Sequence, residues 1–156
     1  MHEDEIWRRP DVVDHSARLI ASFRTCVGRD LIETATHDLQ NAKALFEAPF
    51  ALLSHGVQAD PILNYGNKIA LDLWEMNFQA FTQMPSRLTA EPMLREERQH
   101  LLETAARKGY IDDYSGIRIS ARGTRFRISN VILWSVTDGQ GTKYGQAAMF
   151  DLWEPI

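Results

Sequence analysis

The feature that most constrains the fold is a change of pattern at Gly109. Before this glycine, in the first third of the chain, apolar residues recur at spacings near three and four, which is typical of amphipathic helices. After it come three long strand-like segments, at 110–121, 125–136 and 143–153. Arg122-Gly123 and Asp138-Gly139 separate these segments and favour hairpin turns. The sequence therefore predicts helices first and an antiparallel sheet last.

The part before Gly109 divides into shorter elements. Helices are expected over 11–33 and 36–46, and Pro49 stops the second. Two short strands at 50–55 and 62–65 flank the turn Asp60-Pro61. A helix capped by Asn67 and a long helix over 92–108 follow.

This order of elements predicts an α+β fold. Two strands, a helical crossing segment and three further strands describe the five-stranded antiparallel sheet of a PAS-like domain. Helices should cover one face of that sheet and enclose a small cavity. We expect residues 1–46 to form an N-terminal helical cap and residues 47–156 to form the PAS-like domain.

Composition fits one folded domain in a reducing compartment. The chain has 156 residues, of which 44% are hydrophobic and 24% are charged, so one core is the default. Cys26 is the only cysteine, which rules out an intrachain disulfide and a cysteine-based zinc site. Residues 1–10 have no apolar stretch behind them, so we expect no signal peptide, no membrane anchor and a cytoplasmic protein.

The charge balance argues against nucleic-acid binding. The net charge of −4 should repel phosphates. The one concentration of basic residues comprises Arg118, Arg122, Arg125 and Arg127. It lacks the interleaved aromatic stacking residues that binding of single-stranded nucleic acid requires. We interpret it as a solvated rim.

A series of short motifs resembles the MEKHLA domain family between about Phe46 and Trp153. The motifs stand in register along the chain, which makes the resemblance specific. They include Ser54-His55-Gly56, Asp60-Pro61, Asn64-Tyr65-Gly66-Asn67, Pro85-Ser86-Arg87, Ala90-Glu91-Pro92, the run from Asp113 to Ser120, and Gly145-Gln146-Ala147-Ala148.

The resemblance implies a PAS-like fold and a sensory or regulatory role. The helical N-terminus looks like that of the stand-alone bacterial members of the family. Plant members carry the domain at the C-terminus of homeodomain-leucine-zipper transcription factors, and the DNA-binding parts of those proteins have no counterpart here. The resemblance supplies no established ligand or catalytic residue that could be carried over, so it identifies no cofactor.

The sequence shows no residue pattern that is typical of a catalytic site or a metal site. The five histidines have no metal-binding spacing, and no serine has an evident base. PAS domains can hold haem through a histidine on the long helix, and His100 is the candidate for that role here. It points away from the face of its helix that we expect to be buried, which comprises Leu94, Arg98, Leu101, Leu102 and Ala105. No cysteine follows Gly56, which excludes a covalent flavin adduct. We therefore expect no enzyme and no metal.

Polar residues within apolar segments are the candidate ligand-binding residues. Asn130 interrupts the apolar row Phe126, Ile128, Ile132, Trp134 and Val136, and Gln146 begins the row Ala148, Phe150 and Leu152. These amides either satisfy backbone groups or face a ligand. Arg87 and Arg118 either pair with Glu91, Glu96 or Asp113, or bind an anion. The full candidate set is Asn64, Asn67, Arg87, Arg118, Asn130, Trp134 and Gln146.

Apolar residues are also expected on the other face of the sheet, namely Val131, Leu133, Met149 and Trp153. The N-terminal helices, a second chain or both must cover them, and we expect a homodimer. The leading function is a PAS-like module that binds a small molecule or a protein partner and responds by shifting its N-terminal helices. The alternatives are a ligand-free structural or interaction domain and a small-molecule enzyme.

Overall fold

The computed structural model describes residues 3–156, with the side chains of 3, 4, 92–95, 98, 102, 105 and 106 outside the description. Within residues 3–156, six strands and seven helical segments follow one another. They are η1 (Glu3–Arg8), α1 (Pro10–Val27), α2 (Asp38–Phe46), β1 (Ala51–His55), β2 (Leu63–Gly66), α3 (Lys68–Trp74), α4 (Phe78–Phe81), η2 (Ser86–Thr89), α5 (Pro92–Lys108), β3 (Tyr110–Ile119), β4 (Arg125–Thr137), β5 (Lys143–Phe150) and β6 (Leu152–Pro155).

The strands form one antiparallel sheet in the order β2-β1-β5-β4-β3. The expected third long strand, 143–153, is interrupted at Asp151 and becomes β5 and β6. Both pair with β4: β6 with residues 126–129 and β5 with residues 132–137. The interruption therefore lies where β4 itself is irregular, at residues 130–131.

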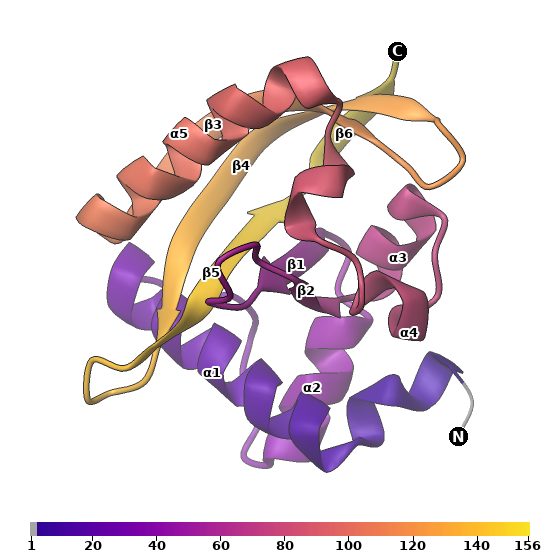
Figure 1. Cartoon of the computed structure of the whole chain (residues 1–156). Helices are drawn as coiled ribbons and strands as arrows, with labels where there is room; N and C mark the ends of the chain where they lie inside the picture. The colour runs from indigo at the N-terminus through magenta and orange to yellow at the C-terminus, as the bar shows by residue number, and fades with distance from the viewer. Residues whose placement is uncertain (1–2) are drawn as a thin grey trace.

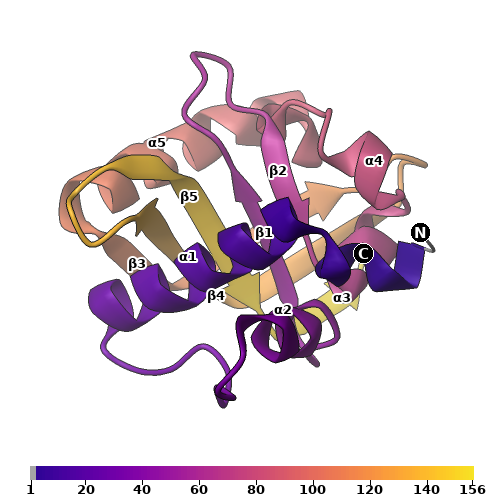
Figure 2. The ribbon, with the colours of Figure 1, turned by 90° about the horizontal axis from the view of Figure 1, so that it is seen from below.

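Helices cover both faces of this sheet (Figure 1). α5 packs on β3 and β4 on one face, which we call the inner face, and α3, α4 and η2 lie beside it. α1 crosses β4 on the opposite, outer face, with α2 against it (Figure 2). The sequence predicted helices over one face and left the cover of the other open, and α1 and α2 provide that cover.

The first helix is shorter than its apolar pattern predicted. α1 starts with Pro10, whose missing N–H costs nothing in a first turn. It ends at Val27 because Gly28 adopts φ 84° and its N–H bonds to the carbonyl of Arg24. Leu31 and Ile32, predicted to continue the helix, lie beyond this cap and still pack against the core.

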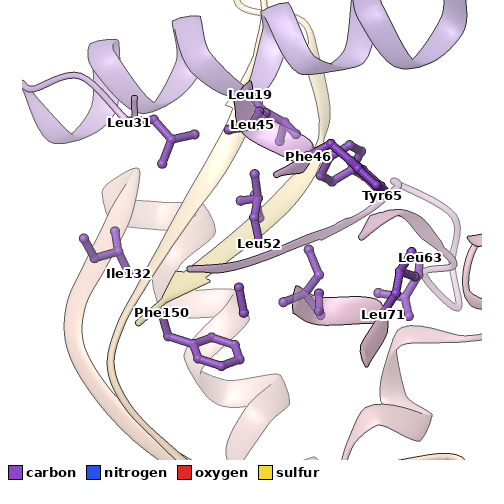
Figure 3. Close-up of a cluster of buried hydrophobic side chains, with 14 of the residues drawn as sticks. Leu19, Leu31, Leu45, Phe46, Leu52, Leu63, Tyr65, Leu71, Ile132 and Phe150 are labelled. Atoms are coloured by element: carbon purple, nitrogen blue, oxygen red, sulfur yellow. The ribbon is translucent and has the colours of Figure 1, made fainter. Parts of the chain in front are cut away.

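The outer-face core joins α1 and α2 to the sheet. Figure 3 shows Leu19 of α1 and Leu45 of α2 meeting above β1, whose Leu52 points toward them. These three side chains are fully buried. The Trp134 indole N–H donates to Ser22 Oγ at 3.0 Å, and the Trp134 ring packs edge-on against Phe23. Apolar burial and one buried hydrogen bond thus fix α1 to β4.

A polar chain also ties α1 to β1 and β2. The Ser54 hydroxyl donates to Asn64 Oδ1 at 2.5 Å, and His15 Nε2 lies 2.9 Å from Ser54 Oγ. His15 Nε2 therefore carries the proton, and its Nδ1 is free to accept from Arg18 at 3.3 Å. Burial and the charge of Arg18 lower the pKa of His15 from 6.5 to about 4.

Because His15 is buried, we expect the free energy of unfolding to begin to fall at a higher pH than the titration of carboxylates would cause. The folded-state pKa is depressed, so the unfolded chain takes up a proton first as the pH falls. The stability contribution of neutral His15 is complete above pH 6.5 and is lost as the pH falls toward about 4. Urea unfolding should show a loss of up to about 3 kcal/mol over this range. In His15→Gln the slope between these pH values should be smaller than in the wild type, and an unchanged slope would contradict this assignment.

The covered outer face weakens the reason for expecting a second chain. α1 occupies the surface that a partner was predicted to cover, so the homodimer stays a prediction. The exposed apolar side chains at this end of the chain are Leu152 and Trp153 of β6 and Ile156 beyond it. Among the described residues, no helix combines the length and apolar character needed to cross a bilayer.

Candidate functional site

A small cavity lies between the inner face of the sheet and the helices above it. Its volume is about 40 Å³. A water molecule needs at least about 10–15 Å³ measured in this way, so the space holds about three waters. Apolar groups form much of the wall, among them Leu53, Trp74, Leu101, Val131, Leu133 and Phe150. Polar residues also line it, namely His55, Ser86, Thr89, Tyr114, Arg118 and Gln146, whereas the hydroxyl of the lining residue Ser54 bonds to His15 and Asn64 on the outer side.

Asn130 does not face this cavity, contrary to the prediction from the sequence. Its side chain is exposed and its backbone has φ 54°. The register of β3 and β4 slips at this point, from Tyr114 opposite Val131 to Gly116 opposite Ile128. Asn130 is therefore a bulge residue, and asparagine tolerates the left-handed conformation better than most residues.

The bulge changes which residues of β4 face inward. Before it, Phe126 contacts Trp74 and Ile128 lines the cavity, as predicted. After it, Val131 and Leu133 line the cavity, although both were predicted on the outer face. Trp134 was predicted to line the cavity and instead contacts α1. One extra residue in a strand reverses the alternation of every residue that follows.

Arg118 is the candidate residue that the structure places most clearly in the cavity wall. Its side chain is 7% exposed. Nη1 donates to the Ile117 carbonyl at 2.9 Å, and Nη2 donates to the Tyr114 hydroxyl at 3.3 Å. Tyr114 and Arg118 both line the cavity from β3, with Gly116 between them. A Cβ on Gly116 would lie 2.9 Å from Arg118 Nη1, so this glycine leaves the room that the guanidinium occupies.

Gln146 also lines the cavity, at the end opposite β3. It stands across from His55 in the pairing of β1 and β5, and both side chains are buried. His55 Nδ1 donates to the Gly56 carbonyl at 2.9 Å. Gln146 and His55 also border a surface groove of about 320 Å³ beside Gln99 and Glu103 of α5. These two residues therefore lie between the cavity and the surface.

The remaining polar wall comes from the crossing segment. Ser86 and Thr89 of η2 are both buried, and the Thr89 hydroxyl donates to the Ser86 carbonyl at 2.9 Å. The Trp74 indole N–H points to the Thr89 carbonyl at 3.4 Å. These bonds hold η2 against α3 and the inner face.

The other candidate residues lie outside the cavity. Asn67 caps α3, as predicted, and is fully buried among backbone groups. Asn64 is exposed on the outer side, where it accepts from Ser54. Arg87 is exposed and pairs with Asp60 at 3.2 Å, whereas the partners expected for it were Glu91, Glu96 and Asp113. Glu91 pairs with Arg125 instead.

His100 is exposed, as the helical pattern predicted. Of the apolar stripe expected opposite to it, Leu101 lines the cavity. The side chains of Leu94, Arg98, Leu102 and Ala105 lie outside the described residues.

Sequence reasoning missed several residues of the cavity wall. Tyr114 and His55 appeared only within the motifs of the family resemblance. Their positions carried a signal: Tyr114 stands four residues before Arg118 on one strand face, and His55 ends a short apolar strand. Ser86 and Thr89 gave no such signal, because their burial depends on how the crossing segment folds back.

Solved structures with this fold are PAS and light-oxygen-voltage domains. A PAS domain from Colwellia psychrerythraea superposes with a TM-score of 0.63 at 15% identity, over 75% of this chain and 94% of that one. A light-oxygen-voltage domain described with a flavin analogue gives 0.58 at 14% identity, over 75% and 84%. The PAS domain of a LuxR-family regulator from Burkholderia thailandensis, in complex with ethanol, gives 0.53 at 16% identity, over 70% and 94%.

The sequence itself matches one family model over nearly its whole length. No curated protein matches the chain. The model of the MEKHLA domain matches residues 13–155, a span that includes most of α1 as well as the sheet. The proposed division into a cap of residues 1–46 and a domain of residues 47–156 stays a prediction. The fold and this match together show that the chain belongs to the MEKHLA domain family and has a PAS-like fold.

Proposed function

We propose that this protein is a cytoplasmic sensory or regulatory module that binds a small molecule in the inner cavity. The observation that carries the proposal is the polar part of the cavity wall. A core that served packing alone would fill this space with aliphatic groups, because buried polar groups cost free energy unless they find partners. Here Arg118, Tyr114 and Gln146 reach one small space.

Strand β4 offers a path from the cavity to the N-terminal helix. Leu133 lines the cavity, and the next residue, Trp134, donates to Ser22 of α1. A displacement of β4 by a ligand would therefore change the contact between Trp134 and α1. Shifted N-terminal helices are the output that we propose for the module.

Two neighbouring structures support a small-molecule site in this fold. One is a PAS domain in complex with ethanol, a molecule of the size that the cavity would accept. Another is a light-oxygen-voltage domain described with a flavin analogue. A flavin is far larger than about 40 Å³, so a small ligand fits this chain better.

Filling the cavity tests this proposal. Ala148 lines it, and Ala148→Leu adds three carbon atoms to that space. The wild-type melting temperature should rise when a deproteinised small-molecule extract of the host cell is added, since a ligand stabilises the state that binds it. Ala148→Leu should show no rise. Ala44→Leu makes the same change at an exposed position of α2 and should respond as the wild type does.

The second candidate function is a ligand-free interaction domain. The small volume of the cavity favours it, as do the exposed Leu152, Trp153 and Ile156 at the end of the chain. Under this alternative no extract fraction stabilises the wild type, and light scattering detects a dimer. An extract effect of equal size in Ala148→Leu and the wild type would exclude binding in the cavity.

A further inference from the structure

The guanidinium of Arg118 is a buried positive charge held in one orientation. It is fixed through the Ile117 carbonyl and the Tyr114 hydroxyl, and its central carbon lies 5.6 Å from the centre of the Tyr114 ring. Gly116 leaves space for it between these two side chains. A guanidinium has five N–H donors, and these bonds use two of them.

This charge has no acidic partner in the part of the chain that the structure describes. The ion pairs formed by arginines there involve Arg8, Arg9, Arg24, Arg87, Arg125 and Arg127. Glu75, Glu91 and Asp60, which lie on segments near the cavity, bond to other groups. The α5 residues whose side chains are outside the description contain no Asp or Glu. A buried charge without a counter-charge costs free energy that an anion would recover.

The cavity limits the size of that anion. Its volume of about 40 Å³ corresponds to about three waters, and thus to a ligand of about three or four heavy atoms. The wall next to the polar groups is apolar, from Val131, Leu133 and Phe150. A planar carboxylate or oxyanion matches the forked donors of a guanidinium, and a methyl group would fit the apolar wall.

We propose that the cavity binds a small monoanion at Arg118, either a short carboxylate or an inorganic oxyanion. This inference rests on the proposed function and names the ligand class. The Arg118 guanidinium binds the two anionic oxygens, the Tyr114 hydroxyl orients the guanidinium, and the apolar wall selects against ligands longer than acetate. Arg87, the other arginine that was considered for anion binding, takes no part because it lies outside the cavity.

The test uses acetate and nitrate as probes, at constant sodium concentration and with gluconate as the balancing anion. Gluconate carries a carboxylate but is too large for the cavity. In the wild type, the Arg118 Nε–H signal in a nitrogen–proton NMR spectrum should shift and saturate with acetate, with nitrate or with both. At a hundredfold excess over the dissociation constant, the melting temperature should rise by about 5–10 °C. A response to acetate alone assigns the site to carboxylates, and one to nitrate alone assigns it to inorganic oxyanions.

Arg118→Met and Arg87→Met provide the matched pair, because each removes one arginine charge. Arg87→Met should keep the full thermal response. Arg118→Met should lose it and, in gluconate, should melt at or above the wild-type temperature, since it removes an unpaired buried charge. The inference is overturned if the Arg118 signal moves with neither probe, or if Arg118→Met responds like the wild type.

This test separates the inference from the function on which it rests. If the cell extract stabilises the wild type through the cavity while neither probe moves Arg118, the ligand is neutral. The proposed function then stands and the inference fails. If the probes bind at Arg118 but no extract fraction acts through the cavity, the anion site exists without the proposed role.

Discussion

Gly145→Ala should prevent stable folding, with a loss of more than about 4 kcal/mol. Gly145 adopts φ 143°, which side chains rarely allow, and β5 there lies directly against β1. An added Cβ would overlap the His55 carbonyl oxygen and would lie 2.8 Å from its carbon and 3.1 Å from the Gly56 Cα. All of these atoms belong to the backbone, so no side chain can move aside.

The control for this substitution lies in the preceding hairpin. Gly139→Ala places its Cβ where no atom lies within 4 Å, and Gly139 has no positive φ. Its free energy of unfolding, measured with urea, should stay within about 0.5 kcal/mol of the wild type. A Gly145→Ala protein as stable as Gly139→Ala would contradict the close approach of β5 to β1.

Asn67→Ala should cost about 4 kcal/mol, which is also in the exceptional range. The side chain is fully buried and its amide satisfies backbone groups from several segments. Oδ1 accepts from the N–H groups of Leu52 and Ala70, and Nδ2 donates to the carbonyls of Leu45 and Phe50. Alanine would leave these groups without this partner, at about 1–3 kcal/mol for each group that stays unsatisfied.

Asn77→Ala is the matched control for a lost helix cap. Asn77 caps α4 from an exposed position and accepts from the Ala80 N–H at 2.8 Å. Its loss should cost about 1 kcal/mol, the usual value for such a cap. Urea unfolding of both variants measures the difference. Equal losses would show that the additional bonds of Asn67 to α2 and β1 contribute nothing.

The sequence predicted most elements because their signals are local. The change of pattern at Gly109, the cap at Asn67 and the hairpin turns each act within a few residues. The end of α1 was misplaced because the apolar spacing continues past Gly28, where the backbone leaves the helix. The division of the last strand into β5 and β6 had no local signal that we recognised.

The cavity was harder to predict, and one residue accounts for much of the error. The prediction assumed that side chains along β4 alternate strictly between the two faces of the sheet, and the bulge at Asn130 breaks this alternation. Trp134 was therefore placed inside and Leu133 outside, the reverse of the structure. An asparagine within an apolar strand has two interpretations, a buried amide or a bulge with positive φ, and the second is correct here. Arg118 and Gln146 do line the cavity, because no bulge separates Arg118 from Tyr114 on β3 or Gln146 from Ala148 on β5.

A ligand in the inner cavity should change the contact between β4 and α1. The indole N–H signals of the four tryptophans, seen in one nitrogen–proton NMR spectrum, report on this contact. Trp74 lines the cavity and Trp134 bonds to α1. Trp153 on the exposed last strand and Trp7 near the N-terminus serve as references. Fractions of the small-molecule extract should move Trp74 and Trp134 together and leave Trp153 in place. If no fraction moves Trp74, or if Trp74 moves while Trp134 stays, the claim is wrong.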